Sequence, residues 1–213
     1  MSCLITCYSL TRNGVVIVNG DTVYSDHNTN NPAEFLNASF RHSRVKYPKF
    51  FKMDNLCKLA FSAAERMLLN AGLKERYPGE RIAIVMQNAA STVDVDTRYW
   101  ETVSDKRNYF PNPALFVYTL PNIMIGEICI KNQIKGENCL FVFDKFDPCF
   151  LFDYTSGLLE SGRADAVISG WVNFDSPDYE AFLLLVEKEE SAVCRIAPFT
   201  KEKTEKLYLS TED

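Results

Sequence analysis

The sequence predicts an α/β fold with a mainly parallel mixed sheet flanked by helices. Short apolar runs that suit buried strands recur along the chain, and segments with the periodicity of a helix separate them. Alternation of this kind is typical of a sheet whose strands are connected by helices. The composition, 46% hydrophobic with 13% aromatic residues, supplies enough apolar surface for a packed core. A length of 213 residues suits a single domain spanning 1–213.

The first fifty residues predict a hairpin and then a loop. Residues 4–7 and 15–18 are apolar, and Asn13-Gly14 lies between them. Because Asn-Gly favours tight two-residue turns, we expect these runs to pair as a β-hairpin. Residues 20–50 are polar and rich in Asn, which predicts a long polar loop. His27 and His42 fall in this segment and are expected to be solvated.

Residues 53–73 carry the clearest helical pattern, with Asp54 placed to cap the helix start. The apolar positions that share one helix face are Leu56, Leu59, Ala60, Ala63, Ala64, Met67 and Leu68. Residues 81–86 are apolar and predict a buried strand. Residues 87–112 are polar and predict an irregular segment.

The second half predicts further alternation of helices and strands. Helices are expected over residues 122–133 and 148–161, and strands over 139–143, 166–169 and 182–187. Pro148 suits the first turn of its helix. Gly126 is expected to let the helix over 122–133 approach a neighbour closely. Residues 188–213 form a C-terminal extension for which the sequence defines no structure.

Charge and motif content exclude several function classes. A net charge of −5 argues against a nucleic-acid binder, because phosphate recognition requires a basic face. The sequence has no Gly-rich phosphate loop, Ser-His-Asp arrangement or zinc signature, so no cofactor or metal is expected. Seven Cys without metal-type spacing indicate a reducing compartment. With no leader and no apolar run of membrane-spanning length, we expect a cytoplasmic protein without a membrane span.

Four short segments of the second half form a recognisable set: YTLPN (118–122), GEI (126–128), KGEN (135–138) and GRADAVISG (162–170). Together they resemble the N-terminal half of a β-ketoacyl-acyl-carrier-protein synthase, a member of the thiolase-like superfamily. In that family a Gly-Pro-Asn strand entry leads to a nucleophilic Cys in a small-residue turn. A helix and a Gly-Asp-Ala-Asp strand entry follow. The resemblance is clearest over residues 113–172 and implies a thiolase-like N-terminal half.

The same resemblance implies that the family's nucleophile is missing. The distance from Lys145 to Gly162 matches the family's distance from the nucleophile to its second glycine, so Lys145 takes the place of the Cys. The family's catalytic His pair belongs to a C-terminal half with no counterpart here. Asp144 and Asp147 flank Lys145 and can offset its charge, and one of them is predicted to cap the following helix.

Two cysteines lie near this degenerate site. Cys149 is four residues beyond the expected nucleophile position and is expected to be buried and structural. Cys139 falls inside a predicted strand and is expected in the core. Two alternatives stay open: an acyltransferase or hydrolase that uses Cys149 or Lys145, and a module that binds an acyl chain or another small molecule.

The favoured hypothesis is a non-catalytic synthase-like protein. By resemblance it would be a partner or chain-length-factor-like subunit in a fatty-acid, aryl-polyene or polyketide-type pathway. It would form a homodimer, or a heterodimer with an active ketosynthase, and acyl carrier protein would be a further partner. In the family the strand matching 139–143 pairs across a dimer axis, and here it is apolar on both faces, which suits a central strand. The helix over 148–161 is apolar nearly all round, and we expect a partner chain, rather than the tail after residue 187, to cover it. The expected interface residues are Cys139, Leu140, Phe141, Val142, Phe143, Phe150 and Leu158.

Overall fold

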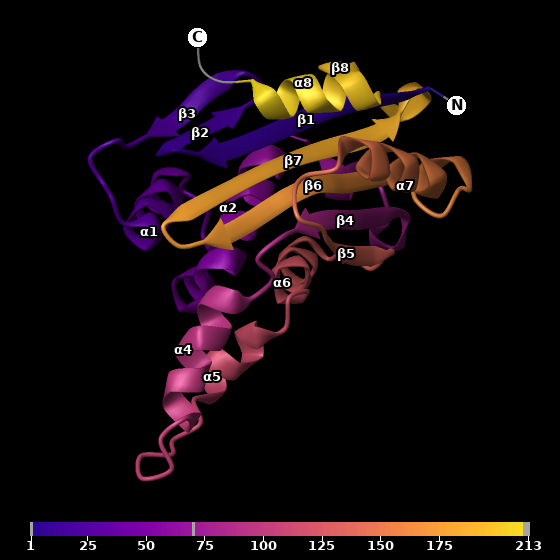
Figure 1. The fold of residues 1–213 in the computed structure, drawn as a ribbon. Coiled ribbons are helices and arrows are strands. Elements are labelled where there is room, and N and C mark those ends of the chain that lie inside the picture. Colours follow the sequence, from indigo (N-terminus) through magenta and orange to yellow (C-terminus); the bar gives the residue numbers. More distant parts are fainter. Residues whose placement is uncertain (1, 70, 211–213) are drawn as a thin grey trace.

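A single mixed sheet forms the centre of the molecule. The structure, a computed structural model, describes residues 2–69 and 71–210. Its strands follow the order β3-β2-β1-β7-β6-β4-β5, and β8 pairs with β1 (Figure 1). The strands are β1 (Cys3–Arg12), β2 (Val15–Val18), β3 (Asp21–Ser25), β4 (Ile82–Asn88), β5 (Asn138–Val142), β6 (Ala166–Asp175), β7 (Asp178–Lys188) and β8 (Ala197–Pro198).

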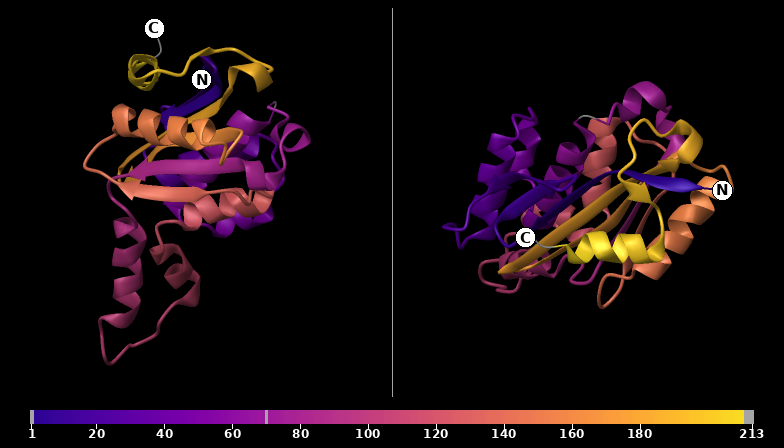
Figure 2. Two further views of the ribbon diagram at one scale, coloured as in Figure 1. Left: turned by 90° about the vertical axis from the view of Figure 1, so that its right-hand side faces the viewer. Right: turned by 90° about the horizontal axis from the view of Figure 1, so that it is seen from above.

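Helices cover both faces of the sheet. Helices α1, α2 and α6 lie on one face, and α7 and α8 lie on the other (Figure 2). The α-helices are α1 (Pro32–His42), α2 (Asn55–Leu68), α3 (Leu73–Arg76), α4 (Val93–Val103), α5 (Pro113–Phe116), α6 (Ile123–Asn132), α7 (Pro148–Glu160) and α8 (Lys201–Leu209). Short 3-10 turns are η1 (Pro48–Lys52), η2 (Gly79–Arg81), η3 (Val117–Thr119) and η4 (Glu189–Ser191).

The predicted α/β class and mixed sheet are confirmed, but parallel pairing is confined to one side of the sheet. Strand β4 runs parallel to β5 and to β6. Strands β1, β2, β3, β7 and β8 join through antiparallel pairings, as β6 does with β7. The expectation of a mainly parallel sheet was therefore wrong, because most of the strand pairings are antiparallel. Tight turns connect β1 to β2 and β6 to β7, and such turns can join only antiparallel neighbours.

The local signals at the hairpin, at α2 and at β4 were read correctly. Asn13 and Gly14 have φ values of 52° and 77°, so both turn residues occupy the left-handed region, as a two-residue hairpin turn requires. Asp54 caps α2 by accepting hydrogen bonds from the backbone N–H groups of Leu56 and Cys57, at 3.2 and 3.1 Å. Strand β4 is buried along its whole length.

Two segments predicted as irregular are ordered. Within residues 20–50 the chain forms β3 and α1, and within 87–112 it forms α4. Asn31 caps α1, and one apolar face of the helix buries Phe35, Leu36 and Phe40. The Phe40 ring stacks on Phe50 at 3.7 Å between centroids. The Asn-rich composition concealed this face, because the apolar residues are few and are spaced at helical intervals.

One part of the chain projects from the body. This arm, residues 93–120, consists of α4, a loop, α5 and η3, and extends beyond the sheet edge formed by β5 (Figures 1 and 2). The rings of Tyr99 and Phe116 meet at 5.5 Å and connect its two limbs. More than half of the exposed large apolar side chains in the described residues lie on the arm: Val93, Trp100, Tyr109, Phe110, Phe116, Val117 and Leu120.

Helix α7 is covered by its own chain, so the expectation that a partner would cover it was wrong. Leu151, Leu158 and Leu159 are buried against the sheet. The C-terminal segment covers another side, where the Phe152 ring lies 5.1 Å from Phe199. The tail after residue 187 can cover the helix because its scattered apolar residues align once β8 and α8 form.

Two smaller features complete the fold. Added side-chain atoms at Gly126 would meet nothing within 4 Å, so this glycine does not serve a close helix approach. Among the described residues, no single helix is long and apolar enough to cross a membrane. Residues 113–119 and α6 reach that length only as a pair bent by 96°.

Candidate functional site

The predicted site is the five-residue loop between β5 and α7. This loop, residues 143–147, leaves the carboxyl end of β5 beside the carboxyl end of its parallel neighbour β4. Ligand sites in sheets with parallel strands form at this end, because the loops that leave neighbouring strands converge there. The loop therefore lies at the end of the sheet where such sites form.

Two residues at the end of β4 hold the loop at both ends. The side chain of Gln87 is fully buried, and its Nε2 donates to the carbonyl oxygen of Asp147 at 2.9 Å. In return the Asp147 N–H donates to Gln87 Oε1 at 2.8 Å. At the other end the Phe143 N–H donates to the Asn88 carbonyl oxygen at 2.9 Å. Sequence reasoning missed Gln87, since an amide at a strand end carries no motif.

Of the two aspartates proposed as caps, Asp147 caps α7. Its Oδ1 accepts a hydrogen bond from the Phe150 N–H at 2.9 Å, and Pro148 follows it at the first helical position. Asp144 is exposed in the middle of the loop. The negative charge of Asp147 at the helix start interacts favourably with the positive end of the helix dipole.

The two central loop residues have opposite environments. The side chain of Phe146 is 7% exposed and packs against Trp171, Phe182 and Tyr208, with centroid distances of 6.4, 5.7 and 4.5 Å. Lys145 is exposed. Phe146 therefore anchors the loop and leaves Lys145 at the surface.

Lys145 and Cys149 line one open cleft between the loop and α8. The cleft has a volume of about 580 Å³. Its lining residues are Phe143, Asp144, Lys145, Phe146, Asp147, Pro148, Cys149, Glu205, Tyr208 and Leu209. The contribution of α8 could not be predicted, although Glu205, Tyr208 and Leu209 are spaced as neighbours on one helix face.

Cys149 differs from its prediction. The expected buried, structural cysteine is exposed in the first turn of α7. The helix start lies at the surface of the cleft, so its second residue points away from the core. Its exposure keeps the alternative of chemistry at this thiol open.

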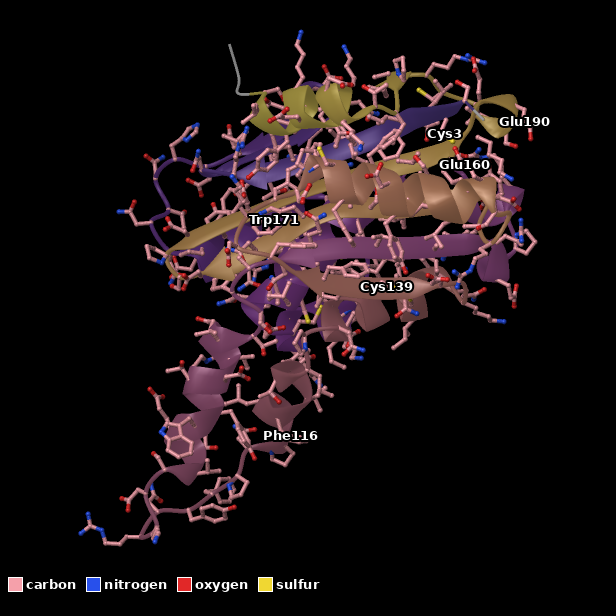
Figure 3. The ribbon with its side chains drawn as sticks, turned by 45° about the vertical axis from the view of Figure 1, so that its right-hand side comes forward. Cys3, Phe116, Cys139, Glu160, Trp171 and Glu190 are labelled. Carbon is pink, nitrogen blue, oxygen red and sulfur yellow. The ribbon has the colours of Figure 1, made fainter. Side chains whose placement is uncertain are left out.

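Cys139 is half-buried, not in the core, because β5 is an edge strand (Figure 3). Its Sγ lies 3.3 Å from Tyr154 Oη, which also donates to Glu137 Oε1 at 2.8 Å. These hydrogen bonds, to Cys139 first and to Glu137, raise the pKa of Tyr154. The cluster connects the edge strand to α7.

The two histidines lie outside the cleft. His27 is exposed after β3, as expected, and His42 ends α1 with its ring 5.2 Å from that of Tyr24. Within residues 2–69 and 71–210, no group of three or more His, Cys, Asp or Glu side chains could hold a metal ion. The cleft brings together the predicted loop residues and Cys149, but no histidine is among its lining residues.

The predicted interface residues separate into two groups. Strand β5 pairs only with β4 among the described strands, so it is an edge and not the central strand that its apolar pattern suggested. Val142 is 58% exposed there. Leu158 is buried within its own chain and is not available to a partner. Phe150 is half-buried against Phe141, at 4.7 Å between ring centroids.

Comparison with solved structures identifies the fold as thiolase-like. The chain is similar to the ishigamide ketosynthase/chain length factor, with 18% identity and a TM-score of 0.66 over 91% of this chain and 64% of that one. It is similar to the complex of the ketosynthase ApeO with its chain length factor ApeC from Xenorhabdus doucetiae, with 13% identity and a TM-score of 0.59 over 99% and 93%. A third similar structure is AntDE:AntF, a type II acyl-carrier protein in complex with its ketosynthase, with 11% identity and a TM-score of 0.61 over 90% and 64%.

These likenesses are of fold. No protein-family model matches the sequence, and no curated protein matches it. The chain spans less than two thirds of the ishigamide chain's length. The ketosynthase-like fold inferred from the segments around Lys145 is confirmed.

Proposed function

We propose that this chain is a non-catalytic, chain-length-factor-like subunit that associates with a ketosynthase. The observation that carries the proposal is Lys145, which stands on the loop between β5 and α7 of a thiolase-like fold, at a cleft whose lining includes no histidine. Ketosynthase condensation requires a thiolate that accepts the acyl group and two histidines that drive decarboxylation. The Lys145 amine cannot form the thioester on which that reaction depends.

The free edge of β5 supports a role in association. An apolar edge strand offers unpaired backbone N–H and C=O groups, and soluble proteins normally protect such an edge. The sequence of β5 is Asn-Cys-Leu-Phe-Val, so the strand itself contains no charged residue that would protect its edge. A partner strand added along β5 would satisfy these backbone groups and cover Val142.

The arm extends on the same side of the molecule (Figures 1 and 2). Trp100 is 65% exposed, Phe110 is 75% exposed and Phe116 is 52% exposed, and a concentration of this kind usually marks a contact surface. Figure 3 shows Phe116 on the arm, away from the sheet. A partner that pairs with β5 would come within reach of the arm. Several solved relatives in fold are ketosynthases described with a chain length factor or an acyl-carrier protein, which supports a ketosynthase as the partner in a polyketide- or aryl-polyene-type pathway.

A second candidate function is acyl transfer or hydrolysis at Cys149. The observation that favours it is the exposure of this thiol at the cleft, in the first turn of α7. Helix starts favour thiolates. Incubation with an acyl-carrier-protein thioester and intact-mass analysis tests it: a covalent acyl adduct that disappears in Cys149→Ser would replace the non-catalytic proposal.

The association test uses light scattering on the pure chain and on its mixture with a ketosynthase encoded beside it. We expect a heterodimer of defined mass. Val142→Lys on β5 and Phe110→Ser on the arm should each weaken it at least tenfold, since each removes exposed apolar contact or adds a charge to it. Val193→Lys, at a 71% exposed position in the turn after β7, is the matched control and should leave it unchanged.

Two results would contradict the proposal. One is a mixture that stays monomeric at micromolar concentration. The other is a complex that tolerates both interface substitutions. A homodimer that persists when the ketosynthase is added, and that Val142→Lys dissociates, would assign the same surface to a second copy of this chain.

A further inference from the structure

A second, smaller cavity lies on the face of the sheet covered by α2. Its volume is about 180 Å³, and it forms where the end of α2, the turn after β2, helix α3 and the end of β7 meet. Its lining residues are Thr6, Cys7, Val18, Asn19, Arg66, Met67, Ala71, Arg76, Leu185, Glu187, Val193 and Cys194. None of them belongs to the cleft at Lys145.

Arg66 is the unusual residue of this cavity. It is only 7% exposed, and its Nη2 donates to the carbonyl oxygen and the Oγ of Ser39, at 2.5 and 3.0 Å. Its Nε is buried without a hydrogen-bond partner, and no carboxylate among the described residues forms an ion pair with it. Burial lowers the pKa of Arg66. A buried guanidinium without a counter-charge is costly, which suggests that an anion completes the site.

The other charges around the cavity balance one another. The fully buried Glu187 accepts from Arg76 Nη1 at 2.5 Å, from Tyr77 Oη at 2.7 Å and from Thr6 Oγ1 at 2.5 Å. Arg76 therefore neutralises Glu187. No second carboxylate among the lining residues balances the positive charge of Arg66.

Asn19 adds a second donor to the lining. Its Oδ1 accepts from the Tyr8 N–H at 2.8 Å, which fixes the orientation of the side chain and directs the amide NH₂ away from that bond and toward Cys7, which also lines the cavity. An amide NH₂ and a guanidinium both donate, and neither accepts through nitrogen. The cavity thus offers donors and one net positive charge to a ligand.

We propose that this cavity binds a compact oxyanion, a small carboxylate or a phosphate, at the Arg66 guanidinium. The volume corresponds to roughly six water molecules at about 30 Å³ each, so it accommodates acetate, malonate or inorganic phosphate, whereas a long acyl chain does not fit. A guanidinium recognises the paired oxygens of carboxylate and phosphate in the same planar geometry. The site is independent of the function proposed for the Lys145 cleft.

Isothermal titration of the full chain with phosphate, acetate and malonate, at constant ionic strength set with chloride, tests the proposal. We expect saturable binding of at least one probe, with one site per chain. Arg66→Gln should weaken it at least tenfold, because it removes the charge-assisted hydrogen bonds between the guanidinium and the anion. Arg98→Gln, which removes an exposed arginine from the arm, is the matched control and should bind like the parent chain.

Asn19→Asp is the second variant, because Arg66→Gln could prevent folding. It keeps the oxygen that accepts from Tyr8 and tolerates the φ of 55° at this position, while it adds a negative charge to the cavity. Binding should be lost with the fold intact by circular dichroism. Binding of phosphate alone or of a carboxylate alone would name the ligand class. No saturable binding of any probe, or equal affinity in a folded Asn19→Asp or Arg66→Gln variant, would overturn the proposal.

Discussion

Gln87 and Asp147 exchange two hydrogen bonds between the end of β4 and the start of α7. The Gln87 amide donates to the Asp147 carbonyl oxygen at 2.9 Å and accepts from the Asp147 N–H at 2.8 Å. One side chain therefore satisfies both backbone groups of the residue that caps α7. This arrangement fixes the loop that carries Lys145 against the end of β4.

Gln87→Ala should lower the free energy of unfolding by about 1–3 kcal/mol, because it leaves the Asp147 N–H unpaired and removes one of the two hydrogen bonds to the Asp147 carbonyl oxygen, the other coming from the Leu151 N–H. Urea denaturation followed by circular dichroism measures this. Asn108→Ala, which removes an exposed amide from the arm, is the control and should change stability by less than about 0.5 kcal/mol. Equal effects of the two substitutions would show that the paired hydrogen bonds do not stabilise the loop.

The two aspartates of the loop should differ in their contributions to stability. Asp147→Ala removes the cap of α7 and should lower the unfolding free energy by about 1 kcal/mol. Asp144→Ala, at an exposed position, should leave it within about 0.5 kcal/mol of the parent value. Thermal denaturation of both variants makes the comparison. A larger loss of stability with Asp144→Ala would contradict the assignment of the cap to Asp147.

Two glycines should respond in opposite directions to alanine. Gly157 lies inside α7 with nothing within 4 Å of an added Cβ, so Gly157→Ala should stabilise the protein by about 0.5–1 kcal/mol. At Gly170 an added Cβ would lie 1.9 Å from the Phe182 carbonyl oxygen, so Gly170→Ala should destabilise the sheet between β6 and β7. Chemical denaturation gives both signs. A stable Gly170→Ala variant would contradict the close packing of these strands.

Alkaline pH should destabilise the fold through Tyr77. Burial, followed by the hydrogen bond to Glu187, raises the pKa of Tyr77 to about 12 from its usual value near 10. Because the folded-state pKa is the higher one, this contribution is fully present below about pH 10 and is lost as the pH rises to about 12. Tyr77→Phe should flatten the fall of stability over that range. An unchanged slope in Tyr77→Phe would exclude Tyr77 as its source.

The pure chain should show no condensation of acyl- and malonyl-carrier-protein thioesters. Removal of a catalytic nucleophile costs orders of magnitude in rate, and Lys145→Cys should not restore activity because the cleft lining includes no histidine. Product analysis by mass spectrometry measures this. Robust turnover that survives Lys145→Ala would place the active site elsewhere.

The sequence by itself determined the features that depend on neighbouring residues. Asn13-Gly14 specified the hairpin turn, Asp54 the start of α2 and the Pro148 region the start of α7, because turns and caps are made by side chains within a few residues of each other. The segments around Lys145 also sufficed to predict the thiolase-like fold. These signals are local, so they can be recognised from a short stretch of the sequence without knowledge of the tertiary structure.

Only the tertiary structure decided which surfaces these elements expose. It placed Cys149 at the cleft, β5 at the edge of the sheet and α8 over α7, and it paired Gln87 with Asp147 across sixty residues. It also left Arg66 Nε buried without a hydrogen-bond partner among residues 2–69 and 71–210. Burial and pairing of this kind depend on contacts between segments distant in the chain, and neither the periodicity of an element nor its composition records which partner it will meet.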